Sequence, residues 1–111
     1  MPHNARPVHE VKANLFRVLG HPARVRILEL LRDGERTVGT LQAELELDSG
    51  GTSQHLAALR RIGLVESRRE GTSVHYRVAD ERVFDLLEAG RDLITRQLAE
   101  QQSMLRELES R

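Results

Sequence analysis

The sequence has no cysteine, few aromatic residues and no long apolar run. The absence of cysteine from 111 residues excludes disulfides, thiolate metal sites and thiol redox switches. With two Phe, one Tyr and no Trp, the core has to be built from Leu, Val, Ile and Ala, and it is thin in so short a chain. No stretch approaches the ~18 apolar residues that span a bilayer, and the first residues show no signal-peptide core. We therefore expect a cytoplasmic protein without membrane contact.

The chain also lacks an excess of either charge, because its formal net charge is zero. Sixteen of the 17 basic residues are Arg, and only Lys12 is a lysine. The charge is unevenly spread: residues 52–77 carry five Arg against Glu66 and Glu70, whereas residues 78–111 carry eight acidic and five basic side chains. A local basic block is typical of proteins that bind phosphate groups. The neutral total therefore does not exclude DNA as a partner.

The first part of the chain predicts a tail followed by helices. Residues 1–10 contain two Pro and no apolar period, so we expect a mobile tail ahead of one domain over residues 11–111. From Val11 the apolar residues recur with the period of a helix, which Gly20 ends. Pro22 is well placed in the first turn of a second helix, where its missing N–H costs nothing.

The middle of the chain predicts a helix-turn-helix. Thr37 is a suitable N-cap for a short third helix. Asp48 or Ser49 is a suitable N-cap for a fourth helix, which Gly63 ends. Two short helices joined by a polar turn are the sequence pattern of a helix-turn-helix.

A hairpin and a long helix follow. Apolar and polar residues alternate over 65–69 and 74–78, and the segment EGTS between them predicts a turn, hence a β-hairpin with a basic tip. From about residue 80 to 110 there is no Pro, and one long helix is expected. Leu87, Ile94, Gln101 and Leu108 of this segment are spaced by seven, as in helices that pair with a partner helix.

Three segments carry a resemblance to a known family. The stretches LFRVLGHPARVRILELL and LDSGGTSQHLAALRRIGLVESRREGTSVHYRV, with the trailing helix, resemble the ArsR family of bacterial repressors and metal sensors over roughly residues 11–110. The resemblance implies a mainly α winged helix-turn-helix with a small β-hairpin, dimerising through its first and last helices (the last about 80–110) and reading a palindromic operator. It implies DNA contacts at Ser49, Gly50, Gly51, Ser53, Gln54, His55, Arg60, Arg61, Arg68, Arg69, Thr72 and Arg77. It implies dimer contacts at Leu15, Leu87, Ile94, Leu98, Leu105 and Leu108.

The chain departs from the family pattern at the start of the recognition helix. Gly50 and Gly51 replace the commoner QPT type of sequence, which loosens the helix start by ~1 kcal/mol for each glycine and removes side-chain contacts to bases. Thr52 stands where the family usually has an inward apolar side chain. We therefore expect the wing, or the shape of the DNA, to carry more of the specificity.

Both metal sites usual in the family are missing. Those sites use cysteines on the recognition helix or Asp/His pairs on the last helix, and this chain has no histidine beyond His75. A nickel or zinc site remains as an alternative, because these metals favour imidazole. It would combine His3 or His9 with carboxylates of the last helix such as Asp85, Glu88 or Asp92.

We expect no enzyme, because the sequence has no P-loop and no GxGxxG. Three functions stay open: a DNA-binding transcription regulator that responds to a metal or another effector, a metal-independent regulator, and a winged-helix module that binds a protein. The expected partners are double-stranded DNA and a second copy of the chain, with a co-regulator protein as a further candidate.

Overall fold

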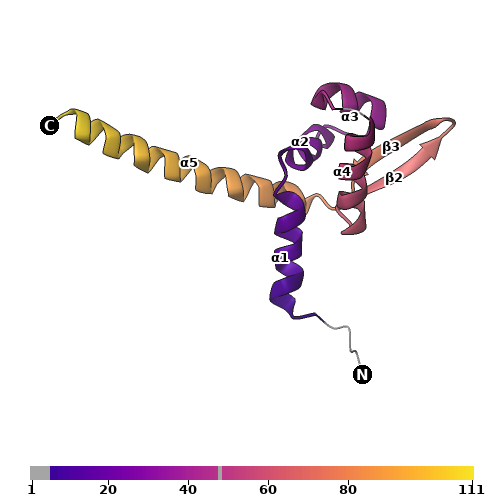
Figure 1. Ribbon diagram of the computed structural model, residues 1–111, viewed down its shortest axis with the longest axis horizontal. Coiled ribbons are helices and arrows are strands. Elements are labelled where there is room, and N and C mark those ends of the chain that lie inside the picture. Colours follow the sequence, from indigo (N-terminus) through magenta and orange to yellow (C-terminus); the bar gives the residue numbers. More distant parts are fainter. Residues whose placement is uncertain (1–5, 48) are drawn as a thin grey trace. The chain divides into compact units, whose positions relative to one another are not determined.

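The computed structural model describes residues 6–47 and 49–111 and divides the chain at Asp80 into two units (Figure 1). The elements in chain order are α1 (Val8–Leu19), α2 (Pro22–Leu31), β1 (Arg36–Thr37), α3 (Val38–Leu45), α4 (Ser49–Arg61), β2 (Val65–Glu70), β3 (Ser73–Val78) and α5 (Arg82–Glu109). The second unit begins at Glu81 and contains α5, and the other elements belong to the first unit. None of the helices in the described ranges is long and apolar enough to cross a membrane.

Helices α1 and α2 form largely as the sequence predicts. Helix α1 begins at Val8, three residues before the expected start, so only the first part of the predicted tail remains outside it. Gly20 ends α1 as expected. Helix α2 has His21 as its N-cap, whose side chain accepts a hydrogen bond from the Ala23 N–H at 3.1 Å, and Pro22 is its first residue.

Helices α3 and α4 build the helix-turn-helix. The Thr37 hydroxyl accepts a hydrogen bond from the Thr40 N–H at 3.2 Å, which confirms the predicted N-cap of α3. Helix α3 ends at Leu45, and its C-cap Glu46 has a left-handed φ of 56° although it is not glycine. Helix α4 ends before Gly63, which has a φ of 78°, as the sequence predicts for a helix stop.

The sheet is antiparallel, with the strand order β1-β3-β2. The predicted hairpin is confirmed: Val65 pairs with Val78 and Glu70 with Ser73. Its two-residue turn has Gly71 at a φ of 61°, as expected where the first central residue must be left-handed. Strand β1 was not predicted, because two residues are too short to show an alternating pattern. It pairs with the middle of β3 and so ties the start of α3 to the hairpin.

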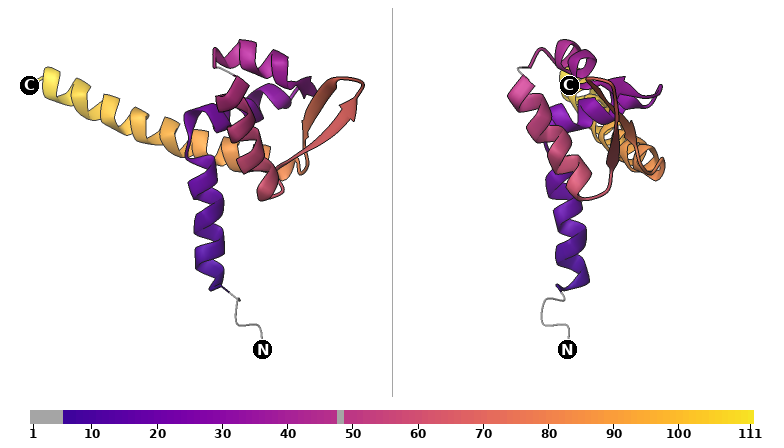
Figure 2. Two further views of the ribbon diagram at one scale, coloured as in Figure 1. Left: turned by 45° about the vertical axis from the view of Figure 1, so that its right-hand side comes forward. Right: turned by 90° about the vertical axis from the view of Figure 1, so that its right-hand side faces the viewer.

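In the first unit α2, α3, α4 and the hairpin lie close together (Figure 2), and the buried side chains of the core come mainly from these elements. The core contains only aliphatic side chains and one threonine, as the scarcity of aromatic residues requires. The fully buried members are Ile27, Leu28, Leu41, Thr52, Leu56, Leu59 and Val65. Each large aliphatic side chain contributes about 1.5–3 kcal/mol by burial, and together they fix the position of α4 and the hairpin.

Helix α5 is a single helix of 28 residues. From Arg91 to its end every residue is exposed, including its apolar ones. Ile94, Leu98 and Leu105 lie on one face, because their spacing of four and seven residues returns to the same side of a helix. The apolar side chains of this face are therefore accessible to solvent.

Candidate nucleic-acid interface

Helix α4 has one buried and one exposed face. Thr52, Leu56 and Leu59 are spaced by four and three residues and are fully inaccessible to solvent. Ser53 and Gln54 are exposed. A helix held by one face and presenting short polar side chains on the other is suited to enter a major groove about 12 Å wide.

The first turn of α4 presents backbone more than side chain. Gly50 is exposed and Gly51 is half-buried, and Ser49 is the first helical residue. Asp48, the other candidate N-cap, lies outside the described residues. The N–H groups of a first turn have no partners within the helix, and the dipole there favours an anion. Glycines let a phosphate approach these groups closely.

His55 contacts the neighbouring helix. It is half-buried, its ring lies 4.2 Å from that of His21, and its Nδ1 accepts a hydrogen bond from Nε of Arg24 at 3.1 Å. Burial lowers the pKa of His55, and the charges of His21 and Arg24 lower it further. The ring is therefore neutral near pH 7, with its proton on Nε2, and any phosphate contact from it uses an uncharged donor.

Two arginines lie in the last turn of α4. Arg60 and Arg61 are both exposed, and Nε of Arg61 donates to the carbonyl of Ala57 at 3.4 Å. Cations in this position stabilise the negative end of a helix dipole. The predicted phosphate contacts from these side chains remain a prediction.

The hairpin carries charged side chains on one face. Glu66, Arg68 and Glu70 alternate along β2, and the register places them opposite Arg77, His75 and Ser73 of β3. The other face carries Val65, Ser67 and Arg69 opposite Val78, Tyr76 and Val74. The wing therefore presents Glu66 and Glu70 among its arginines, so its surface mixes acidic and basic side chains.

Arg68 lies between two carboxylates. Its Nε and Nη2 donate to Glu35, with a shortest N···O distance of 2.6 Å, and its Nη1 donates to Glu70 at 2.7 Å. These hydrogen bonds lower the pKa of Glu35 and of Glu70 and raise that of Arg68. His75 lies 3.7 Å from Glu35 and 3.9 Å from Glu70. These carboxylates compete with a phosphate for the donors of Arg68.

The other wing residues differ in how they are paired. Nε of Arg77 donates to Glu66 at 2.6 Å. Arg69 is exposed and makes no hydrogen bond or ion pair to any residue that the structure describes. Thr72 is exposed in the turn. Of the wing arginines, Arg69 is thus the one whose charge is not balanced by a described carboxylate.

Sequence reasoning missed two of the residues that shape this surface. Glu35 is 33 residues from Arg68 in the chain, and no local pattern connects them. Arg24 is 31 residues from His55. Strand β1 follows Glu35 directly and pairs with β3 of the hairpin. A prediction of this strand would have indicated that the Glu35 carboxylate lies beside the hairpin.

The described residues do not build a metal site. No group of three or more His, Cys, Asp or Glu side chains that could hold a metal ion occurs among them. His9 is an exposed residue of α1, and His3 lies outside the described part of the chain. The proposed ligands on α5 belong to the other unit, so the histidine set predicted from the sequence stays a prediction.

The predicted dimer residues divide into two groups. Leu15 of α1 and Leu87 of α5 are half-buried. The remaining four are exposed by 56–67%, and they are Ile94, Leu98, Leu105 and Leu108. So much accessible apolar surface on one helix marks an interaction site.

Known proteins resemble this chain in sequence. A family model described as "Bacterial regulatory protein, arsR family" matches residues 21–67. The HTH-type transcriptional regulator Rv0081 of Mycobacterium tuberculosis is 40% identical over 103 residues, which cover 92% of this chain and 90% of that protein. The transcriptional activator HlyU of Vibrio cholerae is 40% identical over 74 residues, or 67% of this chain and 68% of that protein.

Solved structures also resemble this chain in fold. The crystal structure of M. tuberculosis Rv0081 has a TM-score of 0.80 and covers 87% of this chain and 98% of its own. The homodimeric winged helix-turn-helix DNA-binding domain from Mycobacterium bovis, in solution, has a TM-score of 0.69 at 36% identity, covering 77% of this chain and 82% of its own. These similar proteins are regulators and not enzymes, as expected for this chain. The chain belongs to the arsR family of bacterial regulatory proteins and is a winged helix-turn-helix transcription regulator.

Proposed function

We propose that the chain is a cytoplasmic, operator-binding regulator that works as a homodimer on a palindromic site. In each copy, α4 enters the major groove, with Ser53 and Gln54 toward base edges and the first-turn N–H groups toward a phosphate. The hairpin contacts the neighbouring backbone. The observation that carries the proposal is the exposed polar face of α4, which the buried Thr52, Leu56 and Leu59 hold outward beside the wing.

The apolar face of α5 supports the homodimer. Six large apolar residues of α5 beyond position 90 are each more than half exposed: Leu93, Ile94, Leu98, Met104, Leu105 and Leu108. Val8, Val11 and Phe16 of α1 are also more than half exposed. A second copy would cover such surfaces with identical ones, as a symmetric pair requires. The M. bovis domain of similar fold is homodimeric.

Selection of bound duplexes from a random DNA pool tests the proposal. We expect an enriched palindrome, and we expect Gln54→Ala to change the preferred base at one position of each half-site. Ser103→Ala, on the polar side of α5, is the control and should leave the preference unchanged. Failure to bind any duplex at low salt would favour the alternative of a winged-helix module for a protein partner, such as a co-regulator.

A nickel or zinc response through His3 and His9 is a second, separable proposal. Imidazole chemistry supports it, and the absence of cysteine restricts the site to nitrogen and oxygen ligands. Calorimetric titration of the wild type and of a His3→Ala/His9→Ala variant tests it. Equal metal affinity in the two proteins would exclude the tail histidines as ligands, and no metal binding in either would leave a metal-independent regulator.

A further inference from the structure

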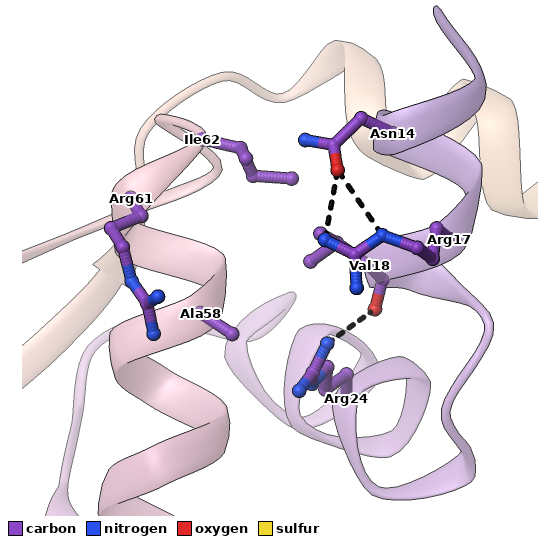
Figure 3. Close-up of a pocket in the computed structure, with 7 residues that line it drawn as sticks. All are labelled: Asn14, Arg17, Val18, Arg24, Ala58, Arg61 and Ile62. Atoms are coloured by element: carbon purple, nitrogen blue, oxygen red, sulfur yellow. Dashed lines mark hydrogen bonds between the residues drawn. The ribbon is translucent and has the colours of Figure 1, made fainter. Parts of the chain in front are cut away.

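A cavity lies between α1, α2 and the end of α4 (Figure 3). Its volume is about 260 Å³. Val18, Ala58 and Ile62 form its apolar wall. The remaining lining residues are Asn14, Arg17, Arg24 and Arg61. Three helices thus contribute one arginine each to a single small cavity.

The three arginines share one property: their described hydrogen-bond partners are all uncharged. Arg17 donates to Oδ1 of Asn14 at 2.8 and 3.2 Å. Arg24 donates to Nδ1 of His55 and to the carbonyl of Val18 at 3.2 Å. Arg61 donates only to a backbone carbonyl. None of the described residues that line the cavity is acidic, so its three arginines have no lining carboxylate beside them.

Stabilisation of helix ends explains only part of this arrangement. Arg17 and Arg61 lie in the last turns of α1 and α4, where a cation interacts favourably with the helix dipole. Arg24 is the third residue of α2, where the dipole disfavours a cation. Its guanidinium instead donates to the carbonyl of Val18 in the last turn of α1 and to His55. These bonds leave further N–H donors of Arg24 for a negatively charged group in the cavity.

We propose that this cavity binds an oxyanion, a phosphate group or a small carboxylate, through Arg17, Arg24 and Arg61. A guanidinium has five N–H donors in a fork that matches such oxygens, and each of these arginines retains donors beyond its described bonds. The volume is below the ~300–1,000 Å³ of typical ligand pockets, which fits a phosphate or a small phosphomonoester. The bound anion would tie the recognition helix α4 to α1 and α2.

Calorimetry with inorganic phosphate tests the site without DNA. The titration uses the full chain in chloride buffer at constant ionic strength, with wild type, Arg17→Gln and Arg61→Gln. Both substituted side chains are exposed, so the fold is expected to persist. We expect each variant to bind phosphate about tenfold more weakly, because a charged hydrogen bond is lost. Arg26→Gln removes an exposed arginine of α2 that pairs with Glu29 at 3.4 Å, and it should bind as the wild type does.

A second titration identifies the source of the anion. DNA binding is measured against salt concentration in phosphate-free buffer. If the anion is a DNA phosphate, Arg17→Gln and Arg61→Gln each flatten the salt dependence and phosphate competes with DNA. If it is a free anion, phosphate binds while the salt dependence stays unchanged. The proposal is overturned if phosphate binds all four proteins equally or not at all and the DNA salt dependence is the same in all four.

Discussion

Arg68 and Glu35 are joined by a two-pronged ion pair, with Nη2 and Nε of the guanidinium both donating to one carboxylate at 2.6–3.1 Å. Glu35 precedes β1, and Arg68 lies in the middle of β2. The pair therefore joins the residue just before β1 to β2, although β3 lies between these two strands in the sheet. It fixes the wing against the body of the first unit and occupies donors that a phosphate would use.

Removing this carboxylate should strengthen DNA binding. In Glu35→Gln, Arg68 loses its strongest competitor for phosphate, so we expect affinity for duplexes of any sequence to rise severalfold and the salt dependence to steepen. Fluorescence titration at several salt concentrations measures both. Glu29→Gln removes the same charge from an exposed pair on α2 and is the matched control. An equal gain in the two variants would mean that only net charge matters.

The arginines of the wing should differ in how much each contributes to DNA affinity. Arg69→Ala removes a cation without a described ion pair, and we expect it to lower affinity for all duplexes and to flatten the log–log salt slope by about 0.9, the value for one phosphate contact. Arg77→Ala removes a cation already balanced by Glu66, so its effect on the slope should be smaller. Equal slopes in the two variants would contradict the pairing seen in the wing.

Stability should fall on mild acidification because of His55. Its pKa in the folded chain lies below its ordinary value of 6.5, so the unfolded chain takes up the proton first as the pH falls. The contribution is complete above about pH 6.5 and is lost as the pH falls through the lower, folded pKa. Urea unfolding at pH 7.5 and 5.5 measures it. His55→Gln keeps an acceptor for Arg24 but does not titrate, and we expect its loss of stability over this range to be smaller.

Disrupting the apolar face of α5 should give monomers. Leu98→Glu places a charge where a second copy would pack, so analytical ultracentrifugation is expected to show a lower mass at micromolar concentration and DNA binding to weaken. Ser103→Glu introduces the same charge on the opposite side of α5 and should leave the mass unchanged. A monomeric wild type would contradict the proposed pairing, and unchanged mass in Leu98→Glu would exclude this face.

The end of α3 should be improvable by one substitution. Glu46 adopts a left-handed φ of 56°, which strains a residue with a Cβ. We expect Glu46→Gly to raise the free energy of unfolding by about 0.5–1 kcal/mol. Glu44→Gly, inside the same helix, should lower it by about 1 kcal/mol. Urea unfolding compares the two, and a destabilised Glu46→Gly would contradict the strain.

The elements that the sequence predicts well are those with local signals. The Thr37 cap, the stop at Gly63 and the turn at Gly71 each depend on residues within a few positions, and all three are found. The start of α1 was placed late because the two prolines of residues 1–10 were interpreted as a tail, although Val8 continues the helical spacing of Val11 and Leu15. The pairing of Arg68 with Glu35, and the packing of Arg24 against His55, depend on tertiary approach across about 30 residues. The candidate DNA-contact residues therefore stay a prediction, and their ion pairing could not be foreseen from the sequence.

The self-balanced wing has a kinetic consequence. A neutral chain whose hairpin cations are largely satisfied internally exerts little long-range attraction on a distant duplex. Encounters with DNA should then proceed at the unsteered rate of about 10⁵–10⁶ M⁻¹s⁻¹ and change little with ionic strength. Residence time on the operator, rather than speed of arrival, would decide how long a promoter stays occupied.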